Sequence, residues 1–256
     1  MTDVAMQKDN RGIYIKNVGI TELTMPIKVK DRTREWQHTT GVFNVFVDLP
    51  AERKGTHMSR LVEIVYQFRK NINHDGLKDM CKVLKDKLDA EVATVELEFP
   101  YFTDTLSPES KTQNLMTHSA RFVAKYDKKY EFQLGVDVDV MTVCPCALEE
   151  CGNGNSHVQR GIVSIDAVTE GWVWLEDLIS AAQASGSSMV FDRLKRPDER
   201  AVVMNGFKHP QFVEDVVRTA ALCLREIDGI KKFRVVAENQ ESIHTHQAYA
   251  EVCWKW

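Results

Sequence analysis

The segment Tyr130–Met141, YEFQLGVDVDVM, alternates apolar and polar side chains along its whole length. Tyr130 and every second residue as far as Val140 are aromatic or aliphatic, and most of the residues between them are charged or carry an amide. Successive side chains of a strand point to opposite faces, so this period of two predicts a long β-strand with one buried face and one wet face. The other elements of the chain lie before and after this strand.

The remaining periodic segments come as pairs of strands and pairs of helices. Runs of β-branched and aromatic residues predict strands, and apolar residues at helical spacing predict helices. The expected strands are 13–29, 39–49, 94–99, 117–126, 159–169, 231–239 and 247–254, and the expected helices are 61–68, 77–88, 172–184 and 210–227. The segments 30–37 and 103–116 are expected to be polar turns or loops. Pro210 is expected in the first turn of the last helix.

The resulting order is β-β-α-α-β-β, repeated once, with a boundary near Asp127. It predicts two units, 1–127 and 128–256. Local hairpins with adjacent helices favour an α+β class with antiparallel sheets over a parallel, doubly wound sheet. The sequence contains no G-x-G-x-x-G and no Walker A loop, so neither a nicotinamide nor a flavin cofactor is expected.

Composition excludes several classes of function. The 256 residues carry a formal net charge of −4, which argues against a general nucleic-acid or membrane-surface role. No stretch approaches the roughly 18–20 apolar residues of a membrane span, and the first residues do not have the pattern of a signal peptide. We therefore expect a cytoplasmic protein with no nucleic-acid or membrane partner.

A cysteine-rich stretch, Cys144–His157, follows the central strand and ends in Gly, Asn and Ser residues. Thiolates and imidazoles are good ligands for zinc and similar metals. Cys144 and Cys146 are not spaced like the C-x-x-C of a structural zinc knuckle. They indicate a partial site of one or two cysteines plus His157, completed from elsewhere; the alternative is a loop with incidental cysteines. The other cysteines, Cys81, Cys223 and Cys253, are expected to be buried and inert.

Two carboxylates are candidates for the rest of a site. Glu199 follows Pro197 and Asp198, and is either part of a charged, exposed turn or an oxygen ligand in an open metal shell. Glu214 either pairs with Arg218 on the surface of a helix or accepts two N–H donors from a ligand, a pair that guanine offers on one edge.

Two further segments carry histidines. If Glu241–His246 is a strand, His244 and His246 share one face and could be ligands or proton donors; the alternative is the polar start of a strand. In Lys54–Arg60, a glycine and a threonine precede a helix, which favours an anion. The alternative there is an ordinary N-cap made by a hydroxyl side chain.

Together and in this order, these motifs resemble the prokaryotic type IB GTP cyclohydrolases. The matching segments are Leu49–Ala51, Lys54–Arg60, Cys144–Cys146, His157 with Gln159 and Arg160, Leu194–Glu199, Phe212–Asp215 and Glu241–His244. The resemblance runs nearly end to end. It implies the tunnelling fold (T-fold), with two tandem β-β-α-α-β-β units, antiparallel sheets and helices on one face. It also implies a homotetramer with active sites at subunit interfaces.

The resemblance implies a role for each candidate. Cys144, His157 and Glu199 would hold one divalent metal, which is zinc, manganese or ferrous iron, and would lower the pKa of a bound water. Glu214 would anchor guanine so that its C8 faces this water. The residues lining the site would be Cys146, Glu241, His244 and His246, with His57, Ser59 and Arg60 on the triphosphate. His244 or His246 would protonate N7.

The implied activity is that of GTP cyclohydrolase I, a hydrolase of cyclic amidine C–N bonds. It converts GTP to 7,8-dihydroneopterin triphosphate and formate, the first step of folate and pterin biosynthesis. The alternatives are an archaeal-type variant that gives the cyclic phosphate, another T-fold enzyme acting on a purine or pterin, and a non-catalytic, zinc-stabilised assembly module. The chain departs from the family pattern at Ala147, where a Ser is expected, and in a longer loop around Cys151, which is a candidate for an extra ligand.

Overall fold

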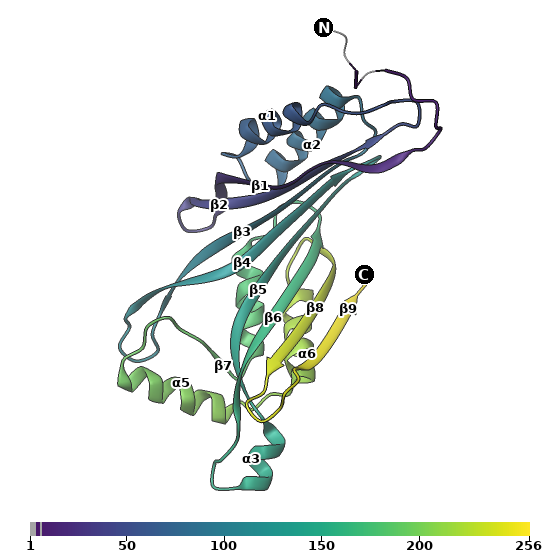
Figure 1. Ribbon diagram of the computed structural model, residues 1–256. Coiled ribbons are helices and arrows are strands. Elements are labelled where there is room, and N and C mark those ends of the chain that lie inside the picture. Colours follow the sequence, from purple (N-terminus) through teal and green to yellow (C-terminus); the bar gives the residue numbers. More distant parts are fainter. Residues whose placement is uncertain (1–3, 6) are drawn as a thin grey trace. The chain divides into compact units, whose positions relative to one another are not determined.

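The computed structural model describes residues 4–5 and 7–256 (Figure 1). The helices and strands, in chain order, are β1 (Ile15–Asp31), β2 (Glu35–Leu49), α1 (Met58–Phe68), α2 (His74–Leu88), β3 (Ala93–Leu106), β4 (Gln113–Tyr126), β5 (Tyr130–Val143), α3 (Pro145–Cys151), β6 (Val158–Thr169), α4 (Leu175–Ser185), β7 (Ser188–Met189), α5 (Arg196–Lys208), α6 (Val213–Arg225), β8 (Ile230–Gln240) and β9 (Ala248–Trp254). No helix within these residues is long and apolar enough to cross a membrane.

The strands hydrogen-bond in the order β1-β2-β3-β4-β5-β6-β8-β9, and the short β7 pairs with β5 off this path. The pairs β1–β2, β2–β3, β5–β7, β6–β8 and β8–β9 are antiparallel. An antiparallel sheet with helices between its hairpins confirms the predicted α+β class. The first half of the chain follows the order β-β-α-α-β-β, whereas the second half adds α3, β7 and α5 to it.

The chain divides into two compact units. One comprises the residues up to Pro100 together with Arg121–Leu134 and Glu170–Trp172, and the other comprises Tyr101–Ala120, Gly135–Thr169 and Val173–Trp256. The sequence-based units 1–127 and 128–256 describe a repeat of element order and stay a prediction. The candidate metal and guanine residues all belong to the second unit.

Strand β5 has the burial that its sequence predicts. Phe132 and Leu134 are 1% exposed, and Val136, Val138 and Val140 are fully buried. Glu131 and Asp139, on the other face, are exposed. Because the strand stays buried as far as Val143, Cys144 is the first residue beyond a rigid element.

Helix α6 packs against β8, β9 and α4 (Figure 1). Its buried residues are Val213, Val216, Val217, Ala220 and Leu224, and their spacing of three and four places them on one face. The first turn carries Glu214 and Asp215, whose negative charges are favourable at a helix N-terminus. The helix begins at Val213, so the expectation that Pro210 lies in its first turn is wrong.

Helix α5 is the largest difference from the sequence prediction, which favoured a charged, exposed turn at Pro197–Glu199. Its start is locally favourable, because Pro197 occupies the first turn and Asp198 and Glu199 follow it there. The helix was missed because its only buried residues are Asp198 and Gly206. Such a helix has no apolar stripe for a periodicity argument to detect.

The hairpins are also longer than their apolar patterns. β1 ends at Asp31 and β2 begins at Glu35. In the second hairpin, β3 ends at Leu106 and β4 begins at Gln113. Backbone hydrogen bonds between two strands can continue through polar residues where both faces of the hairpin are exposed to solvent. The alternation of apolar and polar residues does not predict such segments. Cys81 is buried as expected, but Cys223 is half-buried and Cys253 is exposed, so the expectation of burial is wrong for Cys253.

A buried histidine makes the stability of this fold depend on pH. His118 on β4 is 4% exposed, and its Nε2 lies 2.9 Å from the hydroxyl oxygen of Thr103. Burial lowers the pKa of this imidazole below its ordinary value of 6.5, and the nearby Asp139 and Asp192 oppose the effect only in part. The unfolded chain therefore binds the proton more tightly than the folded chain.

It follows that the free energy of unfolding decreases as the pH falls below about 6.5. We expect His118→Gln, which keeps a hydrogen-bonding side chain but cannot titrate, to lose less stability over this window than the wild type. Urea unfolding of both proteins at about pH 7.5 and about pH 5.5 measures the difference. Equal losses in the two proteins would contradict the assignment.

Candidate functional site

The chain passes from β5 through α3 into β6 (Figure 1), and Cys144 and His157 meet where this connection begins and ends. The amide of Cys144 donates to the carbonyl of His157 at 3.3 Å, and the hydroxyl of Ser156 donates to the carbonyl of Cys144 at 2.8 Å. The intervening α3 is followed by Gly152 and Gly154, both at positive φ, where a side chain would be strained. This closed loop holds the thiol and the imidazole on neighbouring backbone segments.

Both side chains are oriented by their neighbours. Cys144 is the N-cap of α3, and its sulfur accepts the amide of Ala147 at 3.5 Å. The Nδ1 of His157 lies 2.9 Å from Oε1 of Gln159. Because an amide oxygen can only accept, Nδ1 carries the proton and the lone pair of Nε2 is available. A hydrogen bond of this kind is how proteins orient a histidine that ligates a metal.

A cavity of about 210 Å³ opens beside Cys144. Its lining residues are Cys144, Gln159, Gln211, Phe212, Val213, Glu214, Asn239, Glu241 and Ala248. Glu214 reaches it from the first turn of α6, and Glu241 follows the end of β8. The structure therefore places a thiol and two of the candidate carboxylates around one cavity.

His244 and His246 do not lie on a strand, so that expectation is wrong. They occupy the turn between β8 and β9 and are exposed. Their rings nevertheless stack, with centroids 5.0 Å apart, and Nε2 of His244 is 3.4 Å from a carboxylate oxygen of Glu241. The turn therefore keeps the two imidazoles next to a residue that lines the cavity.

Glu199 is not brought to Cys144 and His157 within this chain. It is exposed in the first turn of α5, and no group of three potential ligands forms among the residues that the structure describes. The C-terminal end of α5 is the end that contacts β5, because Gly206 packs on Met141 and Val143 of that strand. Glu199 precedes Gly206 by seven positions, or about 10 Å of helix.

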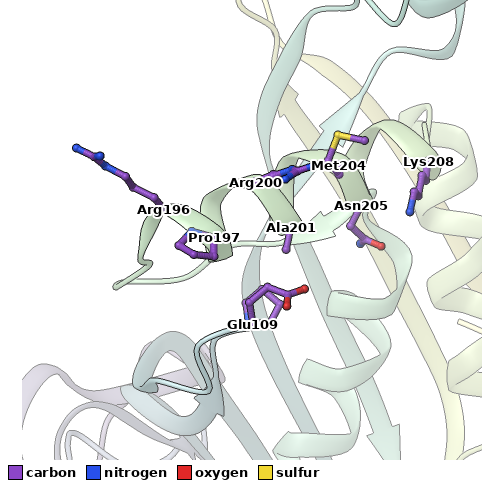
Figure 2. A pocket seen from close by; sticks show the side chains of 9 residues that line it. Glu109, Arg196, Pro197, Arg200, Ala201, Met204, Asn205 and Lys208 are labelled. Carbon is purple, nitrogen blue, oxygen red and sulfur yellow. The ribbon is translucent and has the colours of Figure 1, made fainter.

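Asp198, next to Glu199, is fully buried and was not recognised as important from the sequence. Burial opposes its ionisation, but hydrogen bonds from Ser110, Lys195 and Glu109 outweigh this and hold the pKa of the carboxyl well below its usual range. A second cavity, of about 850 Å³, borders the same helix. Figure 2 shows that Glu109 faces α5 near Ala201, whereas the side chain of Arg196 points away from Glu109.

The remaining candidates lie apart from the cavity lining. Cys146 and Cys151 are exposed on α3. His57, Ser59 and Arg60 lie at the start of α1, in the first unit. His57 is the N-cap and makes no side-chain capping bond, so the alternative that a hydroxyl of Thr56 or Ser59 caps this helix is wrong.

Gln159 lies in one of the family-like motifs, but the sequence predicts no role for it. A signal was present, because residues two apart on a strand share a face, and His157 and Gln159 flank the start of β6. No comparable signal existed for Asp198, whose partners at 109–110 are distant in sequence.

Comparison with known proteins identifies the family. A family model described as type I GTP cyclohydrolase folE2 matches residues 1–250. The chain belongs to this family. The GTP cyclohydrolase FolE2 of Syntrophotalea carbinolica is 42% identical over 252 residues, which are 98% of this chain and 94% of the relative. That of Pseudothermotoga lettingae is 42% identical over 251 residues, covering 98% and 97%.

Solved structures of low sequence identity share the fold. Uricase from Arthrobacter globiformis superposes with a TM-score of 0.52 at 9% identity, over 98% of this chain and 95% of that one. Urate oxidase from Bacillus sp. TB-90 gives a TM-score of 0.55 at 9% identity, over 94% and 99%. These likenesses concern the fold alone, and they confirm the predicted T-fold.

The contact between Gln159 and His157 gives a testable expectation. Replacing Gln159 by Leu removes the acceptor that selects the His157 tautomer, and we expect zinc affinity to fall by about 10–100-fold, as for other residues that orient metal ligands. Gln159→Glu keeps an acceptor at the same position and should retain most of the affinity. Competition with a chromophoric chelator measures both. Unchanged affinity in Gln159→Leu would show that this contact does not orient a ligand.

Proposed function

We propose that this chain catalyses the GTP cyclohydrolase I reaction, the hydrolysis of GTP to 7,8-dihydroneopterin triphosphate and formate. Membership of the family supports the proposal. The observation that carries it is the cavity shared by Cys144, Glu214 and Glu241. A metal-binding type of side chain, a carboxylate suited to guanine and a carboxylate next to an imidazole meet there.

We assign one divalent metal, zinc, manganese or ferrous iron, to Cys144, His157 and Glu199. The donor types fit, because a thiol, an imidazole with an available Nε2 and a carboxylate form a three-ligand set that leaves an open position. When bound, such a metal generates a nucleophilic water at neutral pH. The other steps depend on side chains of the protein.

Glu214 positions the substrate. Its carboxylate can accept two N–H donors from the edge of guanine, and charged acceptors make the stronger hydrogen bonds. The residue sits at the N-terminus of a helix anchored by five buried side chains, so its place at the cavity wall is rigid. Fixing the base in this way turns C8 toward Cys144 and His157.

His244 is the proposed proton donor to N7. It is the histidine that contacts Glu241, at 3.4 Å, and Glu241 lines the cavity. The carboxylate orients the ring, and His246 stacks on it. His57, Ser59 and Arg60 are proposed to hold the triphosphate at the N-terminus of α1.

We propose that the protein is a homo-oligomer, and we expect a tetramer. Within one chain, α5 keeps Glu199 away from Cys144 and His157. We therefore infer that Glu199 completes the ligand set of a second copy, and that each site combines residues of two chains. Cys146 and Cys151, exposed on α3, flank such a site without lining the cavity.

The activity is tested with purified protein reconstituted separately with zinc, manganese or ferrous iron. Incubation with GTP should release formate and yield a product whose mass is that of 7,8-dihydroneopterin triphosphate, fluorescent after oxidation. A product with the mass of the cyclic phosphate would assign the archaeal-type reaction instead. Stoichiometric metal without turnover of GTP in any of the three forms would indicate the assembly module and contradict the proposal.

Glu214→Gln tests the guanine anchor. The substitution replaces an ionic acceptor by an amide, and we expect kcat/KM for GTP to fall by about 10–100-fold, the equivalent of losing a hydrogen bond to a charged group. Arg218→Gln is the matched control, since Arg218 is exposed on the same helix and lies 3.6 Å from Asp215. The control should keep wild-type kinetics. Full activity in Glu214→Gln would exclude the anchor role.

Mixing variants tests the shared site. Cys144→Ala and Glu199→Gln should each be inactive as homo-oligomers. After co-refolding in equal amounts, about a quarter of the sites should combine an intact Cys144 with an intact Glu199 from another copy and regain activity. Mixed oligomers that form, as shown by mass spectrometry, but stay inactive would show that the two ligands do not come from different chains.

A further inference from the structure

Asp198 uses all of its acceptor capacity in a buried position. Its Oδ1 accepts the amides of Glu109 at 2.9 Å and Ser110 at 2.7 Å. Its Oδ2 accepts the hydroxyl of Ser110 at 2.7 Å and the amide of Lys195 at 2.9 Å. The side chain is fully buried, so four donors around one carboxylate replace the water that it loses.

These bonds join two segments that are distant in sequence. Glu109 and Ser110 belong to the turn between β3 and β4, and Lys195 is the N-cap of α5. Asn114 also connects these two segments. Its side chain accepts a hydrogen bond from the amide of Arg193 at 2.8 Å and donates one to the hydroxyl of Ser107 at 3.0 Å. The start of α5 is thus fastened to the turn by polar contacts.

Little else holds this end of the helix. The buried residues of α5 are Asp198 and Gly206, and Gly206 fixes the opposite end against Met141 and Val143. Without an apolar stripe, the first turn gains little from hydrophobic packing. The hydrogen bonds of Asp198 therefore set both the position and the rotation of this turn.

The rotation decides where Glu199 points. Consecutive residues of an α-helix are about 100° apart around the axis. With Asp198 turned inward onto the 109–110 backbone, Glu199 is turned outward, and its side chain is exposed. Two acidic neighbours thus have opposite environments, one buried and saturated with donors, the other presented to the surface.

We propose that Asp198 is a positioning residue for the metal site: by clamping the first turn of α5 to the β3–β4 turn, it presents the Glu199 carboxylate outward to the metal. The inference rests on the proposed role of Glu199 as a ligand. It goes beyond that role, because it assigns the geometry of the ligand to a neighbour that touches neither metal nor substrate.

The decisive variant is Asp198→Asn. The amide NH2 must face either the two backbone amides or the Ser110 hydroxyl and the Lys195 amide, so one pair of donors loses its acceptor. We expect the assembled protein to stay folded, to bind zinc about 10–100-fold more weakly, and to lose hydrogen-exchange protection in the first turn of α5. Glu199→Gln should weaken zinc binding to a similar extent without changing that protection.

The matched control is Asp31→Asn. Asp31 is also a buried aspartate, 3% exposed, and accepts the amides of Thr33 at 2.8 Å and Arg34 at 2.6 Å in the β1–β2 turn. Its loss should lower the melting temperature without changing zinc affinity. If Asp198→Asn does not yield folded protein, Ser110→Ala removes only one of the four donors and should weaken zinc binding by a few-fold, in the same direction.

The outcomes separate the inference from the function that it rests on. Full zinc affinity in Glu199→Gln would remove Glu199 from the ligand set, and the inference would fall with it. Weak binding in Glu199→Gln but wild-type binding in Asp198→Asn would overturn the positioning role alone. Equal weakening in Asp198→Asn and Asp31→Asn would also overturn it, because the effect would then be general destabilisation.

Discussion

The backbone hydrogen bond from Cys144 to His157 is the constraint on which the candidate site depends. It closes the loop through α3, so that a thiol at the end of one buried strand and an imidazole at the start of the next are held on adjacent segments. Strand β5 supplies the rigidity, because its apolar face is buried as far as Val143. Gln159 then selects the tautomer of His157, and the cavity beside Cys144 receives Glu214 and Glu241. A preorganised pair of this kind needs only one further donor to form an open metal shell.

Helices α5 and α6 of the second unit both begin with acidic residues, and they show two ways of placing a carboxylate. Glu214 stands on α6, which five apolar side chains anchor, so hydrophobic packing fixes it at the cavity. Glu199 lies on α5, which has no apolar stripe. The hydrogen bonds of the buried Asp198 fix the start of this helix in place of hydrophobic packing. Polar clamps hold orientation as firmly as apolar contacts when every donor and acceptor is satisfied, and they fail abruptly when one is not.

Residue patterns predicted the parts of this structure that depend on burial. The period of two in Tyr130–Met141 gave β5, and helical spacing gave α1, α2, α4 and the buried face of α6. Patterns could not predict α5, because Asp198 and Gly206 are its buried residues, nor the turn in which His244 and His246 stack. The resemblance to a known family supplied the ligand roles of Cys144, His157 and Glu199, which periodicity alone left open. The supporting roles proposed for Gln159 and Asp198 depend on particular side-chain hydrogen bonds, one made by Gln159 and four made by Asp198, and only coordinates reveal those.

The central claim is that one metal is held by one cysteine sulfur, one imidazole and one carboxylate. X-ray absorption at the zinc edge of the reconstituted, assembled protein measures this set directly. We predict a single sulfur at about 2.3 Å, together with nitrogen and oxygen ligands at about 2.0–2.2 Å. Two or more sulfurs would bring Cys146 or Cys151 into a closed structural site, and a shell without sulfur would remove Cys144. Either result would contradict a metal held by Cys144, His157 and Glu199.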